Sequence, residues 1–477
     1  MILILTELKS RILKSYYLAK SITRRVGMGG NVSKVVLEHA TTPYYCVLYP
    51  SKITIFPTKF RSMARLNPFK AVRPRRDLAH LVASRPVYTY KQNILTAKLE
   101  ENPYTFIQII HPEYAEEDGA NTEPNSPERF EKVRIKFEEF VGAGIFTQDT
   151  EDALYVYKQT KGEHEYLGVI AGASIGEYNA NKIKKHEATL TSREEMFTNY
   201  LDIVGFNAEP VLLCHEKNEL IDRLLEQITT LRPEYEFTTT DHVRHDLWLI
   251  QGKQMDILLQ AFEQLDALYI ADGHHRSASS ARLHERMIER NGGTTGAENH
   301  AYFLSFLISE ERITILPFNR LVKTTNGLSK EELLAQLAPS FDISPLPFAE
   351  APKRMHVIHM YMDHQWYKLT SKSQIISNEE AVSSIDAEIL TRYVLSPILG
   401  IQDLKTDAKI TFLSGETSVE GIEQAVNKGV YKLGFALYPV AIEQVKAVAD
   451  ENAIMPPKST WVEPKLRSGL TIYKIDE

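Results

Sequence analysis

Cysteine is scarce in this chain. Two occur among 477 residues, Cys46 and Cys214, each within an apolar stretch. Two isolated cysteines exclude a disulfide framework and any CxxC redox or zinc motif. Secreted small domains depend on such frameworks, whereas the cytoplasm keeps thiols reduced. We therefore expect a cytoplasmic protein.

Long apolar runs and an excess of positive charge are also missing. No run approaches the roughly 20 residues that a membrane-spanning helix needs. The net charge is -7, whereas proteins that bind nucleic acids carry a basic footprint. We expect neither a membrane nor a nucleic acid as a partner. The oligomeric state is not readable from the sequence.

What is present is typical of a soluble globular protein: 43% hydrophobic and 25% charged residues. The length predicts two lobes, which we expect at 63–325 and 326–477. Residues 1–62 carry ten Lys and Arg against two acids, and we expect them to be an extension outside both lobes. Two explanations stay open, a transit peptide or translation that starts at Met63, and we favour the second.

The pattern of apolar residues predicts a mixture of strands and helices. We expect a short strand at 104–110, a hairpin at 152–175 that turns at Lys161-Gly162, and a helix at 217–231. Strands and helices continue to alternate into the second lobe. The chain is therefore predicted to be an α/β or α+β protein.

The first polar cluster follows a short apolar strand in "ALYIADGHHRSASSARL". Gly273 allows a sharp turn, and a helix is expected from Ser277. A helix N-terminus after a strand attracts anions through its free N–H groups and its dipole. The sequence therefore predicts a phosphate site at this turn.

Side chains of the same cluster strengthen that prediction. His274, His275 and Arg276 add donors, and arginine matches phosphate oxygens with its planar fork. Asp272 suits an anion site only if Mg²⁺ or a cationic group is held there too. Zinc is less well supported, because no HxxxH or cysteine partner is present.

The second cluster is "NKIKKHEATLTSREE", Asn181 to Glu195, in which "KKHE", Lys184 to Glu187, stands where we expect a strand to give way to a loop. A carboxylate beside a histidine can accept the proton of a hydroxyl if its pKa and position suit. A solvated run of charges is the alternative.

The third cluster is "IMPPKSTWVEPKLRSGL", Ile454 to Leu470. Two prolines stiffen the loop that presents Lys458, Ser459 and Thr460, and Lys465 and Arg467 follow. Lysine, hydroxyls and backbone N–H groups are suitable phosphate ligands. The GxxxxGK[ST] pattern is absent, so this is not a P-loop. A fourth cluster, "DHVRHD", contains Arg244 and His245, which we place near the substrate or on an exposed strand.

These segments resemble a known family. "NPFKAVRP", "IKKHE", "VRHDLW", "YIADGHHR", "ALYP" and the third cluster are similar to hallmarks of the prokaryotic family called domain of unknown function 1015. The resemblance runs from about Met63 to the C-terminus.

A more distant resemblance concerns the free serine kinases of the ParB/sulfiredoxin-like fold. They carry a Lys-Pro-His-Glu motif, then Asp-Gly-His-His-Arg after a strand, then Ser-Pro-Lys-Thr-Thr. This chain has "KKHE", "DGHHR" and "PPKST" in the same order. The resemblance implies a nucleotide-binding core with insertions, Glu187 as catalytic base, and nucleotide phosphates held by the Asp272–Arg276 group. Lys185 replaces the proline, and the interval between the first two motifs is longer, which puts serine specificity in doubt.

The sequence thus predicts transfer of a phosphoryl group from ATP or ADP, with Mg²⁺, to the hydroxyl of a small metabolite, with free L-serine as first candidate. The alternatives are a ParB-like nucleotide switch without a small-molecule substrate, a phosphatase, and, less favoured, a sulfiredoxin-like repair enzyme. The expected site residues are Glu187, His275 and Asp272 for catalysis, with Asp272 also as Mg²⁺ ligand; Gly273, His274, Arg276, Ser277, Lys458, Ser459 and Thr460 for phosphates; and His186, Arg244, His245, Lys465 and Arg467 for substrate.

Overall fold

The computed structural model describes residues 33–37, 44–49, 52–57, 65–112, 122–377 and 379–476. Contacts divide the chain into two compact units, Met1–Ser62 and Met63–Glu477. Most of the expected extension, and Met63 itself, lie outside the described residues. The described part of the first unit is an antiparallel sheet of β1 (Ser33–Leu37), β2 (Tyr44–Tyr49) and β3 (Lys52–Pro57).

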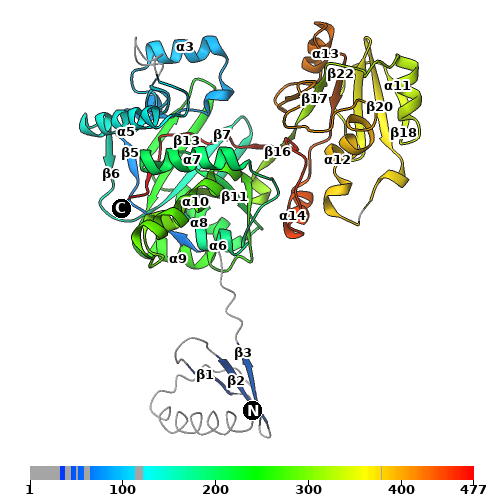
Figure 1. Cartoon of the computed structure of the whole chain (residues 1–477). Helices are drawn as coiled ribbons and strands as arrows, with labels where there is room; N and C mark the ends of the chain where they lie inside the picture. Colours follow the sequence, from blue (N-terminus) through cyan, green and yellow to red (C-terminus); the bar gives the residue numbers. More distant parts are fainter. Residues whose placement is uncertain are drawn as a thin grey trace. The chain divides into compact units, whose positions relative to one another are not determined.

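The larger unit contains two extended sheets within its described residues (Figure 1). The first has nine strands in the order β12-β13-β7-β8-β15-β11-β14-β9, with β4 paired to β8. Their bounds are β4 Leu66–Asn67, β7 Leu154–Lys161, β8 His164–Ser174, β9 Ile183–Lys184, β11 Val211–His215, β12 Tyr235–Thr238, β13 Val243–Ile250, β14 Leu268–Asp272 and β15 Tyr302–Ser309.

Helices cover both faces of this sheet. Successive side chains of a strand point to opposite faces, so each face has a core of its own. Leu213 of β11 belongs to the core beneath α8 (Glu219–Thr229) and α9 (Gly252–Phe262). Its neighbour Leu212 belongs to the core on the other face, with Leu201 of α7 (Thr191–Val204) and Leu283 of α10 (His274–Asn291). Helices α7 and α10 lie side by side (Figure 1).

An N-terminal layer of helices packs around its own aromatic cluster, which includes Phe106, Phe137, Phe146 and Phe206. The remaining elements of this part are β5 Val72–Pro74, α2 Ala79–Val82, α3 Gln92–Glu101, α4 Ile107–Ile110, α5 Pro127–Gly142, β6 Phe146–Gln148, α6 Ile175–Asn179 and β10 Phe206–Asn207.

The second sheet has the order β18-β20-β19-β22-β17-β21 and a separate core. Its strands and helices are β17 Asn319–Val322, α11 Lys330–Leu337, β18 Phe341–Leu346, β19 Val357–Met362, β20 Gln365–Ser371, α12 Asp386–Leu390, β21 Ile410–Leu413, α13 Val419–Asn427, β22 Leu433–Ala436 and α14 Ile442–Asp450. The α/β class and the second α/β lobe are therefore confirmed.

The C-terminal tail returns from the second sheet to the first. Strand β23 (Thr460–Glu463) pairs with β16 (Thr314–Pro317), and β24 (Tyr473–Lys474) pairs with β10. Tyr473 is fully buried in the core of the first sheet. Strand β17 belongs to the second sheet although it precedes residue 325, and the tail returns to the first sheet although it follows that residue. The expected division at residue 325 therefore stays a proposal.

The expected strand at 104–110 is wrong, because residues Ile107–Ile110 form α4. The amide of Gln108 donates to the carbonyls of Leu99 and Asn102, which fixes a helical turn against the end of α3. The hairpin at β7 and β8 and the helix at 217–231 are confirmed. No helix in the described part of the chain combines the length and apolarity that a bilayer span requires.

Candidate functional site

The turn between β14 and α10 brings the first polar cluster to the edge of the sheet. Gly273 has φ +103°, a left-handed conformation that only glycine adopts easily. The first helical hydrogen bond runs from Ser277 N to the carbonyl of Gly273. The helix therefore begins at His274, three residues before the expected start, and His274, His275 and Arg276 form its first turn.

A cavity of about 100 Å³, here called the small cavity, lies beside this turn. Residues from all three motifs meet in it, including parts of the 455–459 loop and β23, together with Phe318, which follows β16. The loop is held to the "KKHE" segment by a hydrogen bond of 2.9 Å from Met455 N to the carbonyl of His186. The small cavity is lined by Tyr88, His186, Glu187, Ala271, Asp272, Phe318, Met455, Pro456, Lys458, Ser459, Thr460, Trp461, Val462 and Lys465.

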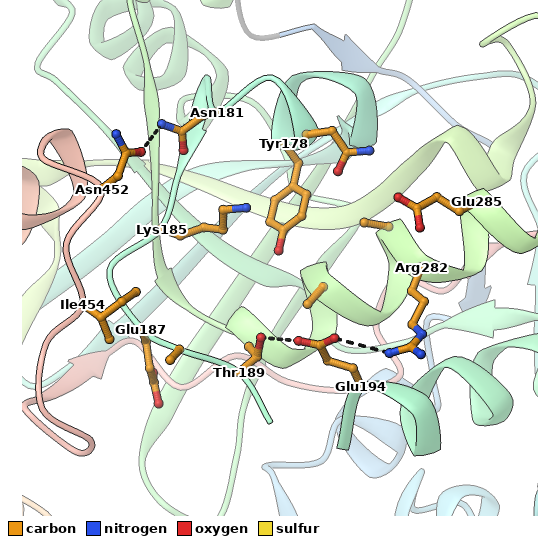
Figure 2. Close-up of a pocket in the computed structure, with 14 residues that line it drawn as sticks. Tyr178, Asn181, Lys185, Glu187, Thr189, Glu194, Arg282, Glu285, Asn452 and Ile454 are labelled. Carbon is orange, nitrogen blue, oxygen red and sulfur yellow. Dashed lines mark hydrogen bonds and ion pairs between the residues drawn. The ribbon is translucent and has the colours of Figure 1, made fainter. Parts of the chain in front are cut away.

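A second cavity of about 570 Å³, the large cavity, also has Glu187 on its wall (Figure 2). This volume falls in the range of small-molecule sites. Figure 2 shows Lys185 beside the ring of Tyr178, and the two are in cation–π contact at 4.1 Å. The large cavity is lined by Tyr178, Asn179, Asn181, Lys185, Glu187, Ala188, Thr189, Glu194, Ala278, Ala281, Arg282, Glu285, Asn452 and Ile454.

Glu187 lies on the wall of both cavities. Burial raises the pKa of its carboxyl above the usual value, although Lys458 acts in the opposite direction. A carboxylate with a raised pKa is a stronger proton acceptor than an ordinary glutamate. The position and the pKa of Glu187 both suit a general base.

Two buried histidines stand behind this carboxylate. The rings of His186 and His274 meet edge to face at 4.5 Å, and Nδ1 of His274 lies 3.5 Å from Glu187 Oε2. Burial lowers the pKa of His186 to about 4 and holds that of His274 well below its ordinary value, so both rings are neutral at physiological pH. Nδ1 of His186 and Nε2 of His274 have no hydrogen-bond partner among the described residues. Buried polar atoms normally have one, so these nitrogens are candidate ligand contacts.

Asp272 faces the small cavity at the end of β14 and forms an ion pair with Lys465, at 3.0 Å from Nζ to Oδ2. Burial opposes ionisation of Asp272, but Lys465 and Arg276 outweigh it, and the pKa of Asp272 lies below its usual value. Lys465 also lies over the ring of Trp461, at 4.4 Å. A charged pair with fixed geometry therefore forms one side of the small cavity.

The third motif presents its side chains from an irregular loop that leads into β23. Lys458 has φ +58° and lies with Nζ 5.4 Å from the centre of the Phe318 ring. The hydroxyl of Ser459 donates to the carbonyl of Pro456 at 2.7 Å. The lysine and Thr460 are thus the stronger candidates for contacts with a phosphate.

Arg276 and Ser277, two other predicted phosphate ligands, are engaged within the protein, and His275 lies outside both cavities. Arg276 donates to the carbonyls of Glu209 and Pro210 and lies 3.0 Å from the Glu209 carboxylate. The hydroxyl of Ser277 donates to the carbonyl of His274. His275 lines neither cavity; burial lowers its pKa, and its Nδ1 has no partner among the described residues. Their expected roles stay predictions.

Three predicted substrate contacts lie away from both cavities. Arg244 is half exposed and pairs with Glu236 and Asp246. His245 is buried between the hydroxyls of Tyr157 and Thr239. Arg467, also buried, donates to Asp241 at 2.8 Å. Of the expected substrate residues, the structure brings His186 and Lys465 to the small cavity.

The structure adds residues to the large cavity for which no role was predicted. Tyr178 and Asn181 come from α6 and the turn after it, and Asn452 follows α14; the two asparagine side chains are hydrogen bonded (Figure 2). Glu194 binds Thr189 and lies 3.7 Å from Arg282. Asn181, Thr189 and Glu194 lie within the second cluster, where no role was predicted for them. Tyr178 and Asn452 lie outside the clusters, so the sequence carried no signal for them.

Cys214 lines neither cavity. The thiol of Cys214 is fully buried, and burial raises its pKa to about 12, which leaves an inert thiol. No group of three or more His, Cys, Asp or Glu side chains that could hold a metal occurs among the described residues.

The family described as "Protein of unknown function (DUF1015)" matches residues 66–388. No curated protein sequence matches the chain. Similar solved structures include a free serine kinase in complex with AMP (12% identity, 64% of this chain and 91% of the other, TM-score 0.32). A conserved hypothetical protein from Pyrococcus furiosus is 14% identical over 64% and 94% of the two chains, with a TM-score of 0.31. SbnI from Staphylococcus aureus, truncated at its C-terminus, is 12% identical over 63% and 85%, with a TM-score of 0.33. At these TM-scores the likeness carries no argument about activity.

Proposed function

This chain belongs to the DUF1015 family, and we propose that it transfers a phosphoryl group from a nucleotide, ATP or ADP, to the hydroxyl of a small metabolite. One observation carries the proposal: Glu187 lies on the wall shared by both cavities. A group held in one cavity can therefore meet an acceptor at this carboxylate. Phosphoryl transfer depends mainly on such positioning and on charge neutralisation.

The large cavity has the volume for the nucleotide, and the small cavity is where the phosphoryl group and the acceptor hydroxyl meet. Lys458 and Lys465 line the small cavity and supply positive charge for the phosphate oxygens. The hydroxyl oxygen of the acceptor bonds to phosphorus while the bond from phosphorus to the rest of the nucleotide breaks. Glu187 accepts the proton that this hydroxyl loses. Its raised pKa suits that step.

Mg²⁺ is compatible with these residues. It binds proteins through one or two carboxylates and takes further oxygens from phosphates and water. Asp272 is ionised, partly exposed and at the small cavity, so it fits the place of such a carboxylate. Bound Mg²⁺ would neutralise phosphate charge, and Lys465 holds the Asp272 carboxylate in position at 3.0 Å.

Free L-serine is the first acceptor to test, because the three motifs stand in the order found in free serine kinases. A cytoplasmic location agrees with the low cysteine content. The acceptor must carry a hydroxyl and must be small, because the small cavity has a volume of about 100 Å³.

The decisive experiment incubates the purified protein with Mg²⁺ and ATP or ADP against a panel of amino acids and small polyols. A phosphorylated acceptor, detected by ³¹P NMR and mass spectrometry, is the expected result. Nucleotide hydrolysis at a rate that no acceptor changes would indicate a ParB-like switch instead. Phosphate release from phosphorylated metabolites without nucleotide would indicate a phosphatase.

A further inference from the structure

Arg320 is a fully buried arginine on an inner strand of the second sheet. It lies on β17, where its cross-strand neighbours are Phe412 on β21 and Phe435 on β22. None of its surface is exposed, and its guanidinium lies 5.2 Å from the centre of the Phe412 ring. This burial lowers the pKa of Arg320 to about 9, so the side chain is still charged at neutral pH.

The hydrogen bonds of Arg320 go to two carbonyl groups. Nη2 donates to the carbonyl of Lys458 at 3.1 Å, and Nη1 donates to the carbonyl of Phe318. Nε has no partner among the described residues, and no carboxylate there forms an ion pair with this guanidinium. An unpaired buried charge costs several kcal/mol of stability. A neutral side chain of similar volume would fill the same place at a smaller cost in stability. Packing alone therefore does not account for Arg320.

Both carbonyl acceptors belong to residues that line the small cavity. Lys458 lies in a left-handed conformation, with φ +58°, which a residue with a side chain rarely adopts without support. Arg320 donates to the backbone carbonyl of this residue. The Lys458 ammonium lies 5.4 Å from the centre of the Phe318 ring. Arg320 thus fixes the backbone of the two residues that hold the ammonium in place.

The charges around the cavity favour an anion. Lys465 is already paired with Asp272. Lys458 interacts with the nearby carboxylate of Glu187 but forms no ion pair among the described residues, and Arg320 adds a positive charge with which no carboxylate there pairs. Water is excluded from Arg320, so its field is weakly screened. Glu187 and Asp272 thus stand against three positive groups, and an oxyanion in the small cavity would balance the charge that is left over.

We infer that Arg320 is a positioning residue, which holds Lys458 against the small cavity and favours binding of a phosphate group there. The inference rests on the proposed function and names residues of that same site. The inference gives Arg320, which lies outside all three motifs, a role in phosphate affinity.

Calorimetric titrations with MgADP and with adenosine test this inference. Arg320→Met removes the charge and keeps the apolar volume. The variant should bind MgADP about tenfold more weakly, the loss expected for a charged hydrogen-bonding contact, while adenosine affinity stays unchanged. Its melting temperature should be unchanged or higher, because an unpaired buried charge is removed. Val322→Ala, which damages the core on the same strand, is the control; it should lower the melting temperature and leave MgADP affinity unchanged.

A second background tests whether Arg320 acts through Lys458. Glycine adopts φ +58° easily, so Lys458→Gly removes the ammonium without backbone strain. In that background Arg320→Met should cause little further loss of MgADP affinity, since coupled residues are not additive. A full further loss would contradict a role through Lys458.

Each outcome separates this inference from the proposed function. If the wild-type protein binds neither MgADP nor adenosine, the proposed function fails. If it binds MgADP and Arg320→Met binds it equally well, Arg320 has no part in phosphate binding and the proposed function stands. Should Arg320→Met not fold, Arg320→Lys, which keeps the charge but lacks the planar fork, is measured in the same way; wild-type affinity in that variant overturns the positioning role.

Discussion

The carboxylate of Glu187 lies 3.5 Å from Nδ1 of His274, which joins the second motif to the first turn of α10. Burial holds the pKa of His274 well below its ordinary value, so this histidine is neutral and does not neutralise the carboxylate. Glu187 therefore keeps its raised pKa while its orientation is fixed. A base that is positioned but not paired is what hydroxyl activation requires.

Glu187→Gln should abolish phosphoryl transfer and leave nucleotide binding intact. Glutamine keeps the shape of the side chain but cannot accept the proton, and loss of a general base costs about a hundredfold or more in kcat. Turnover and MgADP affinity are measured on the same preparation. Glu163→Gln, in the exposed turn between β7 and β8, is the control. Equal turnover in wild type and Glu187→Gln would remove Glu187 from the mechanism.

Lys458→Met should move the acid limb of the kcat profile to higher pH. Glu187 must be ionised to accept a proton, so the rate falls as pH falls through its pKa. Lys458 lowers that pKa against the larger effect of burial, and removing the lysine raises it further. The profile is recorded at saturating substrates, with Lys253→Met on the exposed side of α9 as control. An acid limb at the wild-type position would show that Lys458 does not act on the catalytic base.

The sequence predicted those features that depend on local pattern. The hairpin of β7 and β8 follows from alternating apolar residues and the turn at Gly162, whose φ is +61°. The three polar clusters were recognisable because each stands where a strand or a rigid loop ends. Residues of all three, among them Glu187, Asp272 and Lys458, line the small cavity, and their roles stay predictions.

Features that depend on tertiary contacts could not be predicted. The apolar run at 104–110 suits a strand as well as a helix. The hydrogen bond from Gln108 to the carbonyl of Leu99 in α3 stabilises the helix. Arg276 was expected to face a phosphate because arginine often does so, yet Glu209 and Pro210 lie within its reach. Arg320 looks like an ordinary strand residue in the sequence, and only the fold reveals its burial.

Gly273→Ala should destabilise the protein by about 1–2 kcal/mol, the cost of a left-handed conformation for a residue with a side chain. The added Cβ would also lie 3.1 Å from the guanidinium of Arg276 and press on its contact with Glu209. Urea denaturation measures the free energy of unfolding. Gly142→Ala is the matched control, since a Cβ there meets nothing within 4 Å and alanine favours the helix end. Equal stability of Gly273→Ala and wild type would contradict the strained turn.

The buried histidines should make the fold sensitive to acid. The pKa of His186 is about 4 in the folded protein, because of burial, against an ordinary value of 6.5. Between these values the unfolded chain binds a proton that the folded chain does not, so stability rises with pH across this window and is lost as pH falls. The shift corresponds to about 3 kcal/mol for His186 between pH 6.5 and 4.

His186→Gln should remove the part of the acid-induced loss of stability that comes from His186, because glutamine does not titrate. Carboxyls whose pKa is raised by burial act in the opposite direction, as at Asp386, whose pKa is about 7, so the slopes of variant and wild type are compared rather than read singly. Urea denaturation at intervals from pH 7 to pH 4 gives these slopes, with the exposed His164→Gln as control. If stability falls equally steeply with and without His186, the ring is either protonated in the folded protein or reached by water, and its place as a neutral neighbour of His274 is wrong.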